Sequence, residues 1–330
     1  MRGARAVRPV ASRTVIDDRA QALAHVVRGD LVESVHRGHL VLLDADAAVV
    51  RHRGDPDVTF FARSSLKPLQ AVAMLRAGLD LDGELLALAC GSHSGEPRHL
   101  DGVRRILAGV GRTEDDLANA ADLPLGADDG ARWRAQGHQP SSLAQNCSGK
   151  HAAMIATCVA AGWEVGGYLD PAHPLQHAVR DTVADLTGDG GPAHVSVDGC
   201  GAPLFSCTLR GLARAFARLA RAEPGSPEQR VATAMAAHPH WVGGTGRTAT
   251  VLMAAVPGLV AKDGAEGVCA AALPDGRALA VKVLDGAMRP IPVVAAAALR
   301  ALGVEGAELD RIGEVEVRGG GEPVGAVRAV

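Results

Sequence analysis

The pattern of apolar and polar positions predicts both strands and helices in this chain. Residues 31–53 form two β-favouring stretches on either side of the turn-forming Asp44-Ala45-Asp46, which predicts a pair of strands. In residues 65–79 the apolar positions fall close to the 3.6-residue spacing of a helix. Further helices are expected over residues 84–90, 97–109, 113–121, 150–162, 174–186, 208–221, 227–237 and 290–302.

The C-terminal third predicts strands again. Residues 266–286 read as a hairpin, because Asp275-Gly276 is a favoured two-residue turn and apolar stretches flank it. A last strand is expected over Ile312–Val317, and Thr113 with Asp116 is expected to cap a helix. Strands at both ends of the chain with helices between them favour a single α+β domain.

Composition narrows the class of protein. Of the 330 residues, 47% are hydrophobic and 22% charged, as in globular proteins, and the net charge of −3 argues against a nucleic-acid partner. Aromatic residues make up only 2%, which leaves few faces for base stacking. No apolar run is long enough to span a membrane, and no apolar stretch follows the N-terminal arginines as a secretory signal requires. We therefore expect a cytoplasmic protein with a flexible tail over residues 1–25 and one domain over residues 26–330.

The first candidate chemistry is a Ser-x-x-Lys pattern at the start of the helix expected after residue 64. Ser64 and Lys67 are three residues apart, so a helix places them on one face, where a neutral Lys67 amine can take the Ser64 proton. Pro68 is tolerated in a first helical turn. Taken alone, the pattern is weak evidence, because isolated instances are mostly a capping serine and a solvated lysine.

The order of later motifs strengthens this interpretation. Ser92-His93-Ser94 and then Lys262-Asp263-Gly264 follow along the chain, in the succession found in serine β-lactamases and penicillin-binding proteins. The middle motif here lacks the usual Asn, and the third has Asp where Thr is usual. The succession predicts two Ser–Lys pairs, Ser64 with Lys67 and Ser92 with Lys262.

Two cysteines form a second candidate site. Cys147 lies in Asn-Cys-Ser-Gly-Lys-His and Cys200 in Asp-Gly-Cys-Gly, both polar and glycine-rich, and two thiolates with a lysine or histidine suit a soft metal such as zinc. Their spacing is not a standard zinc signature, so on the residues alone two unrelated thiols are favoured. The remaining cysteines are expected to be buried and reduced: Cys90, Cys158, Cys207 and Cys269.

With these motifs in place, the chain resembles the asparaginase II family of rhizobial type over roughly residues 28–325. The resemblance rests on long stretches of rare residues in fixed order, namely LVESVHRGH, FARSSLKPLQA, CGSHSGEPRH, QNCSGKHAAM, VDGCGAP, HPHWVGGTGR and VAKDGAEGV. It implies a fold similar to serine β-lactamases and glutaminases, with a central, mainly antiparallel sheet flanked by helices. It also implies a homodimer that hydrolyses L-asparagine to L-aspartate and ammonia without an organic cofactor.

The resemblance also implies site residues. The two Ser–Lys pairs fall on Ser64–Lys67 and Ser92–Lys262, and a zinc-associated set falls on Cys147, Lys150 and Cys200. One departure is Thr248-Ala249-Thr250, where relatives commonly carry an acidic residue. The expected reaction is attack by Ser64, with Ser92 as the rival nucleophile, to form an acyl-enzyme that water then hydrolyses.

Four further residues are expected to bind substrate because they adjoin the motifs. Arg63 is expected to bind the α-carboxylate and Asp198 the α-ammonium, while His93 and Glu96 complete the set. The alternatives are a surface charge for Arg63, a turn former for Asp198, and neighbour-orienting hydrogen bonds for His93 and Glu96.

Three other functions stay open at this stage. A β-lactam or peptide hydrolase fits Ser-x-x-Lys, although the missing export signal argues against it. A catalytically inactive relative that binds an amino acid is a second alternative. Glutaminase activity is the third, because a pocket discriminates one methylene by only about 1–3 kcal/mol.

Overall fold

The computed structural model describes residue 16 and residues 18–330. Its main sheet has the strand order β10-β11-β1-β2-β9-β8-β7, with β3 paired to β2, and a smaller sheet has the order β4-β6-β5. The strands are β1 (Gln21–Arg28), β2 (Leu31–Leu43), β3 (Val49–Arg53), β4 (Thr59–Phe61), β5 (Val195–Val197), β6 (Pro203–Thr208), β7 (Val260–Gly264), β8 (Val268–Ala272), β9 (Ala278–Val283), β10 (Val315–Gly319) and β11 (Glu322–Ala329).

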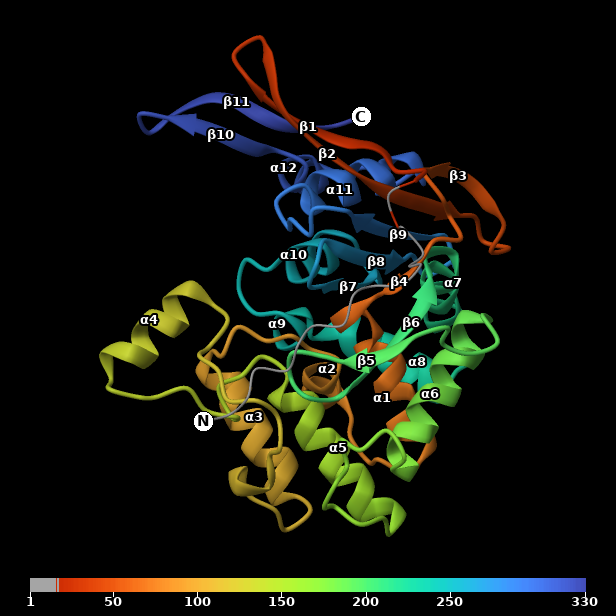
Figure 1. Cartoon of the computed structure of the whole chain (residues 1–330), viewed down its shortest axis with the longest axis vertical. Coiled ribbons are helices and arrows are strands. Elements are labelled where there is room, and N and C mark those ends of the chain that lie inside the picture. The colour runs from red at the N-terminus through yellow and green to blue at the C-terminus, as the bar shows by residue number, and fades with distance from the viewer. Residues whose placement is uncertain (1–15, 17) are drawn as a thin grey trace, which may run out of the picture.

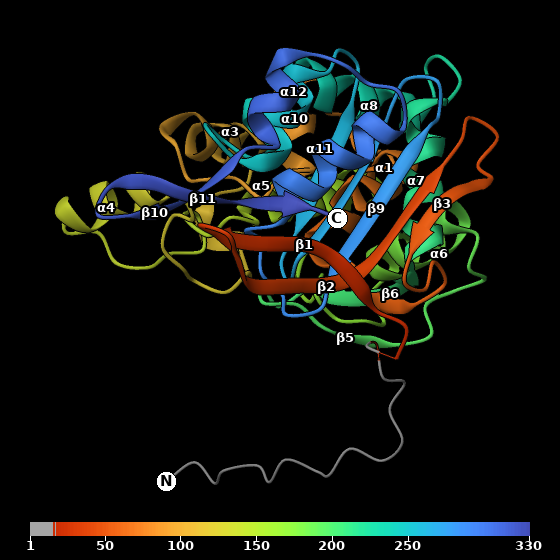
Figure 2. The same ribbon diagram turned by 90° about the horizontal axis from the view of Figure 1, so that it is seen from above.

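The two ends of the described chain meet in the main sheet. β1 pairs antiparallel with β11 in the register Val26 to Val327, and β2 pairs with β9 in the register Leu40 to Val281. Figures 1 and 2 show these red and blue strands side by side. The expectation of strands from both chain ends around a helical middle is confirmed, as is the α+β class with a mainly antiparallel sheet.

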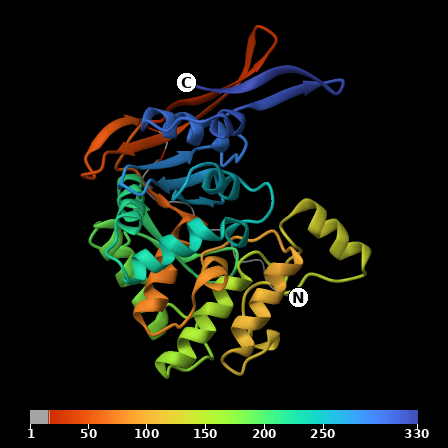
Figure 3. The same ribbon diagram turned by 180° about the vertical axis from the view of Figure 1, so that it is seen from behind.

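The helices form the rest of the molecule. Helix α7 packs against β2, β8 and β9, and α11 against β9 and β11. Figures 1 and 3 show the remaining large helices gathered at the end opposite the sheet. The helices are η1 (Arg63–Leu66), α1 (Lys67–Arg76), α2 (Gly83–Ala89), α3 (Pro97–Ala108), η2 (Glu114–Asp116), α4 (Ala127–Ala135), α5 (Ser148–Ala161), α6 (Pro174–Thr187), α7 (Leu209–Ala220), α8 (Pro227–Ala237), α9 (Pro239–Val242), α10 (Thr248–Ala255), α11 (Ile291–Ala301) and α12 (Ala307–Ile312). Within the described range, none of these helices has both the length and the apolar character that crossing a bilayer requires.

Most expected elements are confirmed, including the Asp275-Gly276 hairpin, whose turn glycine has φ +94°. Two expectations are wrong. Residues 113–121 form only the short η2, because Leu117 leaves the helical region (ψ 113°), although Thr113 N–H does donate to Asp116 as expected. The last strand begins at Val315 rather than Ile312, since Ile312 is the end of α12.

The N-terminal boundary also moves. β1 begins at Gln21, so residues 21–25, expected in the tail, belong to the sheet, where Leu23 and Ala24 are buried. The rest of the expected tail, residues 1–15 and 17, lies outside the described residues.

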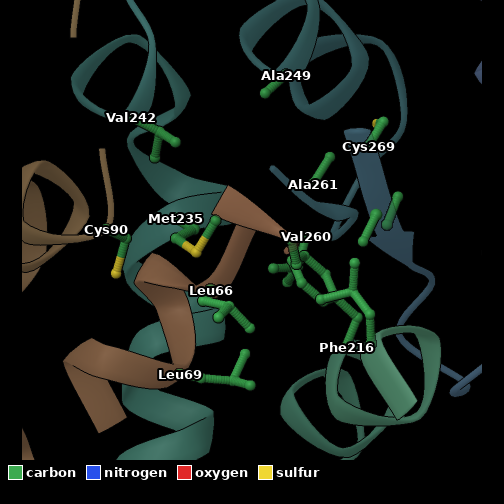
Figure 4. Close-up of a cluster of buried hydrophobic side chains, with 14 of the residues drawn as sticks. Leu66, Leu69, Cys90, Phe216, Met235, Val242, Ala249, Val260, Ala261 and Cys269 are labelled. Atoms are coloured by element: carbon green, nitrogen blue, oxygen red, sulfur yellow. The ribbon is translucent and has the colours of Figure 1, made fainter. Parts of the chain in front are cut away.

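The core fixes the start of α1. Leu66 and Leu69 are almost completely buried, in a cluster that includes Phe216, Met235 and Val260 (Figure 4). Burial of a leucine side chain contributes about 1.5–3 kcal/mol. The turn that carries Ser64 and Lys67 is therefore held by apolar contacts on one side, which leaves its other side to form a site.

Candidate active site

Ser64 lies on a strained turn. It is the second residue of η1, which leads directly into α1, and Pro68 occupies the first turn of that helix. The preceding residue, Arg63, has φ +53°, a left-handed conformation that is costly for a residue with a side chain. Such strain concentrates at functional sites, where surrounding contacts enforce it. The strained residue beside Ser64 thus makes this turn a candidate functional position.

Strand β7 approaches this turn closely. A Cβ atom added to Gly264 would lie 2.6 Å from the Ala62 carbonyl oxygen, so only glycine permits the approach. Ser65 Oγ donates to the Lys262 carbonyl oxygen at 3.2 Å. These contacts bring the Lys262-Asp263-Gly264 motif alongside the Ser64 turn, although almost 200 residues separate the two in sequence.

Both candidate serines line one cavity. Its volume is about 250 Å³, and its wall is formed by Ser64, Ser92, Leu125, Asn146, Arg247, Asp263, Gly264, Ala265 and Met288. Arg247 is the one cationic side chain among the described residues that line it. The structure therefore places the two Ser motifs and the Lys-Asp-Gly motif around a single space.

The hydrogen bonds of the two lysines differ from the expected pairing. Lys67 Nζ donates to Ser92 Oγ at 3.0 Å and to the Gly91 carbonyl oxygen at 2.5 Å. Lys262 Nζ donates to the carbonyl oxygen of Asp263 at 2.5 Å and to its carboxylate at 3.2 Å. Lys67 thus bonds to Ser92 rather than to its helix neighbour Ser64, because the chain beyond α2 places Gly91 and Ser92 next to its Nζ atom. Lys262 bonds to Asp263 rather than to Ser92.

Burial and neighbouring charges set the protonation of this motif. Burial lowers the pKa of Lys262, and the cations of Lys67 and Arg247 act in the same direction, while Asp263 opposes them. Burial alone would raise the pKa of Asp263, but Lys262 and Arg247 hold it at about 2. Asp263 is therefore an anion at neutral pH, and it also pairs with Arg247 at 3.2 Å.

Arg63 and Asp198 contact each other. Arg63 Nε donates to Asp198 at 2.8 Å, and a second, longer contact of 3.9 Å runs from Arg63 to Glu266. Although burial raises the pKa of Asp198, hydrogen bonding and the cations of Lys150 and Arg63 lower it overall. Both side chains are expected to bind substrate, but neither belongs to the wall of the serine cavity.

His93 and Glu96 also lie outside that wall. His93 is completely buried, shares a hydrogen bond of 2.9 Å with Ser148 Oγ, and stacks on His99. Burial lowers the pKa of His93 well below its ordinary value, so its ring is neutral. Glu96 accepts a hydrogen bond from the Thr245 N–H at 2.6 Å and pairs with Arg98. The structure thus gives both residues neighbour-orienting contacts.

The two motif thiols meet the motif lysine. Lys150 Nζ lies 3.1 Å from Cys200 Sγ, and Cys147 and Cys200 are buried together. Contact with Cys200 lowers the pKa of the Cys147 thiol well below its ordinary value, whereas the same contact and burial raise that of Cys200. Burial alone would lower the pKa of Lys150, but the two sulfurs raise it overall.

This donor set fits a soft metal ion. It offers two sulfurs and one amine at the buried start of α5, and zinc takes such ligands. Lys150 must lose its proton to coordinate, because an ammonium has no lone pair. Among residues 16 and 18–330, no group of three or more His, Cys, Asp or Glu side chains is placed to hold a metal. The lysine would therefore have to serve as the third ligand.

Several wall residues were not predicted. Asn146 is the first residue of the motif that contains Cys147, and this membership could have identified it. Leu125 and Met288 lie in segments without a motif, so nothing in the sequence singled them out. They reach the cavity only through the fold.

The family model for L-asparaginase II matches residues 24–329. Among curated proteins, no sequence matches this chain. Among solved structures, a β-lactamase from Mycobacterium bovis (Mb2281c) is 18% identical with a TM-score of 0.45, and covers 81% of this chain and 95% of its own. EstCE1, a hydrolase with promiscuous acyltransferase activity, is 15% identical with a TM-score of 0.41, and the match covers 79% of this chain and 93% of EstCE1. A Bacillus glutaminase is 13% identical with a TM-score of 0.32, and the match covers 74% of this chain and 83% of the glutaminase.

Proposed function

Because this chain belongs to the L-asparaginase II family, we propose that it hydrolyses the side-chain amide of L-asparagine through an acyl-enzyme on Ser64. The observation that carries the proposal is the shared cavity of Ser64 and Ser92, with Lys67 hydrogen-bonded between their segments. A small cavity with one cation suits a small substrate that carries a carboxylate.

Ser64 is assigned as the nucleophile because it lies on the strained turn at the start of α1. A neutral lysine amine has two N–H groups and one lone pair. The Gly91 oxygen and Ser92 Oγ use the two N–H groups of Lys67, so its lone pair remains to take the proton of Ser64. The buried Lys67 is thereby assigned as the general base.

The reaction then proceeds in two steps. Ser64 Oγ bonds to the amide carbon as its proton passes to Lys67, and the C–N bond breaks. Ser92 gives its proton to the departing nitrogen and receives one from Lys67 along their hydrogen bond. Water attacks the resulting ester, gives a proton through Lys67 to Ser64 Oγ, and releases aspartate.

Arg247 is assigned the substrate's α-carboxylate. It lines the cavity, while Arg63, the residue expected in this role, donates to Asp198 outside it. Arg247 forms an ion pair with Asp263, and Asp263 forms a second ion pair with Lys262. Lys262 thus acts as a positioning residue in this proposal, through the chain of charges from Lys262 to Arg247.

We also propose that Cys147, Lys150 and Cys200 hold a zinc ion. A bound zinc ion would supply Lewis-acid charge. It would also link Lys150 of α5 to Cys200 in the loop before β6 and so stabilise the contact between these two segments. A cytoplasmic location and a homodimer complete the proposal, and both rest on the family resemblance and on composition.

The test is ammonia release from L-asparagine and from L-glutamine, measured side by side for the wild type and Ser64→Ala. Turnover of asparagine that Ser64→Ala abolishes, with circular dichroism unchanged, supports the proposal. A wild type that hydrolyses neither amide, with or without added zinc, would refute it. Preference for glutamine would move the assignment to a glutaminase.

A further inference from the structure

A second chamber adjoins the serine cavity. Its volume is about 620 Å³, and it shares Leu125 and Arg247 with the smaller cavity of about 250 Å³. The segment from Ser92 to Glu96 runs past both spaces, since Ser92 lines the first and Ser94 and Glu96 line the second. The two spaces therefore meet at Leu125 and Arg247.

The second chamber is bounded by three connected segments. Ser94 Oγ donates to the Gly243 oxygen at 2.9 Å, and the Gly126 N–H donates to the Ser94 oxygen at 2.8 Å. The Thr245 N–H donates to Glu96. Helix α4 forms the outer wall, and Figures 1 and 3 show it standing away from the body of the molecule. The chamber is thus a built extension of the site with one protruding wall.

The walls of the chamber carry charges of both signs. Arg98 pairs with Glu96 at 2.9 Å, and Arg132 pairs with Asp129 at 3.1 Å, so cations and carboxylates alternate around it. Such a lining suits a charged organic group better than an apolar one. Ammonia, the leaving group of asparagine, is too small to need this space. A larger group on the departing nitrogen would reach the chamber along the Ser92–Glu96 segment, because Ser92 is assigned to protonate that nitrogen and Ser94 and Glu96 line the chamber.

We propose that the chamber binds the amino-acid leaving group of β-aspartyl dipeptides, which the enzyme cleaves by the reaction proposed for asparagine. This inference rests on the proposed function. Ser64 Oγ bonds to the β-carbonyl carbon, the isopeptide C–N bond breaks, and the released α-amino group takes the proton that Ser92 delivers. Water then frees aspartate from the ester. The carboxylate of the departing amino acid pairs with Arg98 or Arg132 at the chamber wall.

The test fills the chamber without touching the serines. Ala127 lines the chamber at the start of α4, and Ala127→Trp introduces bulk there. Ala131→Trp makes the same change on the same helix at an exposed residue outside the chamber wall, and serves as the matched control. The substrates are β-aspartyl-leucine, followed by leucine release, and L-asparagine, followed by ammonia release.

We expect the wild type to cleave both substrates and Ser64→Ala to cleave neither. Ala127→Trp should lower kcat/KM for the dipeptide by about tenfold or more and leave that for asparagine within about twofold, with Ala131→Trp unchanged for both. Asparagine turnover without dipeptide cleavage overturns this inference alone, as does an equal effect of Ala127→Trp on both substrates or no effect on either. Failure of the wild type on both substrates refutes the proposed function itself.

Discussion

Lys67 Nζ donates a hydrogen bond of 3.0 Å to Ser92 Oγ, and this bond joins the helix that follows Ser64 to the second serine motif. The lysine is almost completely buried, and its other acceptor is the Gly91 carbonyl oxygen. The buried Lys67 side chain is therefore bonded to one of the two serines that line the cavity, Ser92. In the proposed reaction, this bond is the path by which Lys67 returns to Ser92 the proton that it takes from Ser64.

The first prediction separates the two serines. Ser64→Ala removes the nucleophile and should lower kcat for asparagine by about 10⁴-fold or more, since a lost nucleophile is among the costliest changes in an enzyme. Ser92→Ala should still acylate, but more slowly, and mass spectrometry of the quenched reaction should detect the ester. Ser94→Ala is the control, because Ser94 faces the second chamber. An ester found on Ser92 in Ser64→Ala would reverse the assignment.

The second prediction concerns Arg247. Arg247→Met should raise KM for asparagine by about 10-fold to 100-fold, because a hydrogen bond to a charged group contributes about 1.5–3 kcal/mol. The wild type should prefer asparagine to 3-aminopropanamide, which lacks the α-carboxylate, and the variant should lose that preference. Steady-state kinetics on both amides provides the measurement.

Arg63→Met is the comparison for Arg247, since Arg63 pairs with Asp198 outside the serine cavity. It should preserve the preference for asparagine over the amide without the carboxylate. If Arg63→Met abolishes that preference and Arg247→Met does not, the role belongs to Arg63, as expected from the sequence.

The third prediction uses the buried carboxylate of Asp263. Its pKa is about 2 in the folded protein against an ordinary 3.8, because Lys262 and Arg247 favour the anion. A lowered pKa stabilises the fold fully above pH 3.8, and that stabilisation is lost as the pH falls toward 2. The contribution is about 2 kcal/mol. Urea unfolding of the wild type and Asp263→Asn between pH 5 and pH 2 should show the gap in unfolding free energy narrowing. Asp80→Asn, at an exposed residue, is the control, and a constant gap for Asp263→Asn would contradict the assignment.

Local sequence signals predicted the regular elements well. The hairpin of β8 and β9 has its turn at Asp275-Gly276, and most helices begin and end within a few residues of their expected limits. Prediction from the sequence failed where tertiary contacts determine whether a segment forms a helix. Residues 113–121 favour a helix by capping, but the chain turns away at Leu117, and α4 and α10 were not expected at all.

The site shows the same division. The motifs identified Ser64, Ser92, Lys67 and Lys262, but sequence spacing could not show which hydroxyl group each lysine contacts. The bond from Lys67 to Ser92 depends on how the end of α2 meets α1. The two residues are 25 positions apart in sequence, and only folding brings them together. The wall residues Leu125 and Met288 come from segments without a motif, and only the packed structure brings them to the cavity.

The fourth prediction concerns zinc. Cys147→Ser and Cys200→Ser should each reduce bound zinc, measured by atomic absorption after dialysis. Cys158→Ser, on the helix α5 that carries Lys150, should not. Although burial lowers the pKa of Lys150, the two sulfurs raise it overall, so zinc must displace the lysine proton, and zinc affinity should rise about tenfold per pH unit for each proton released. Affinity independent of pH would exclude Lys150 as a ligand.

The last prediction concerns the contact between α5 and α2. A Cβ atom on Gly149 would lie 2.6 Å from Leu88 Cγ and 2.7 Å from the Leu88 oxygen, so Gly149→Ala must push α5 away from α2. Overpacking of this kind costs about 1–3 kcal/mol, which urea unfolding should show as a lower free energy of unfolding. Because Cys147 and Lys150 flank Gly149, the shift should also weaken zinc binding.

Gly166→Ala is the control for Gly149, since a Cβ atom there would have ordinary contacts only, at 3.5 Å or more. It should leave stability within about 0.5 kcal/mol of the wild type. Equal stability of the two variants would show that α5 can move without cost. Loss of stability in Gly149→Ala with zinc binding intact would show that the thiols and Lys150 hold their positions independently of this helix contact.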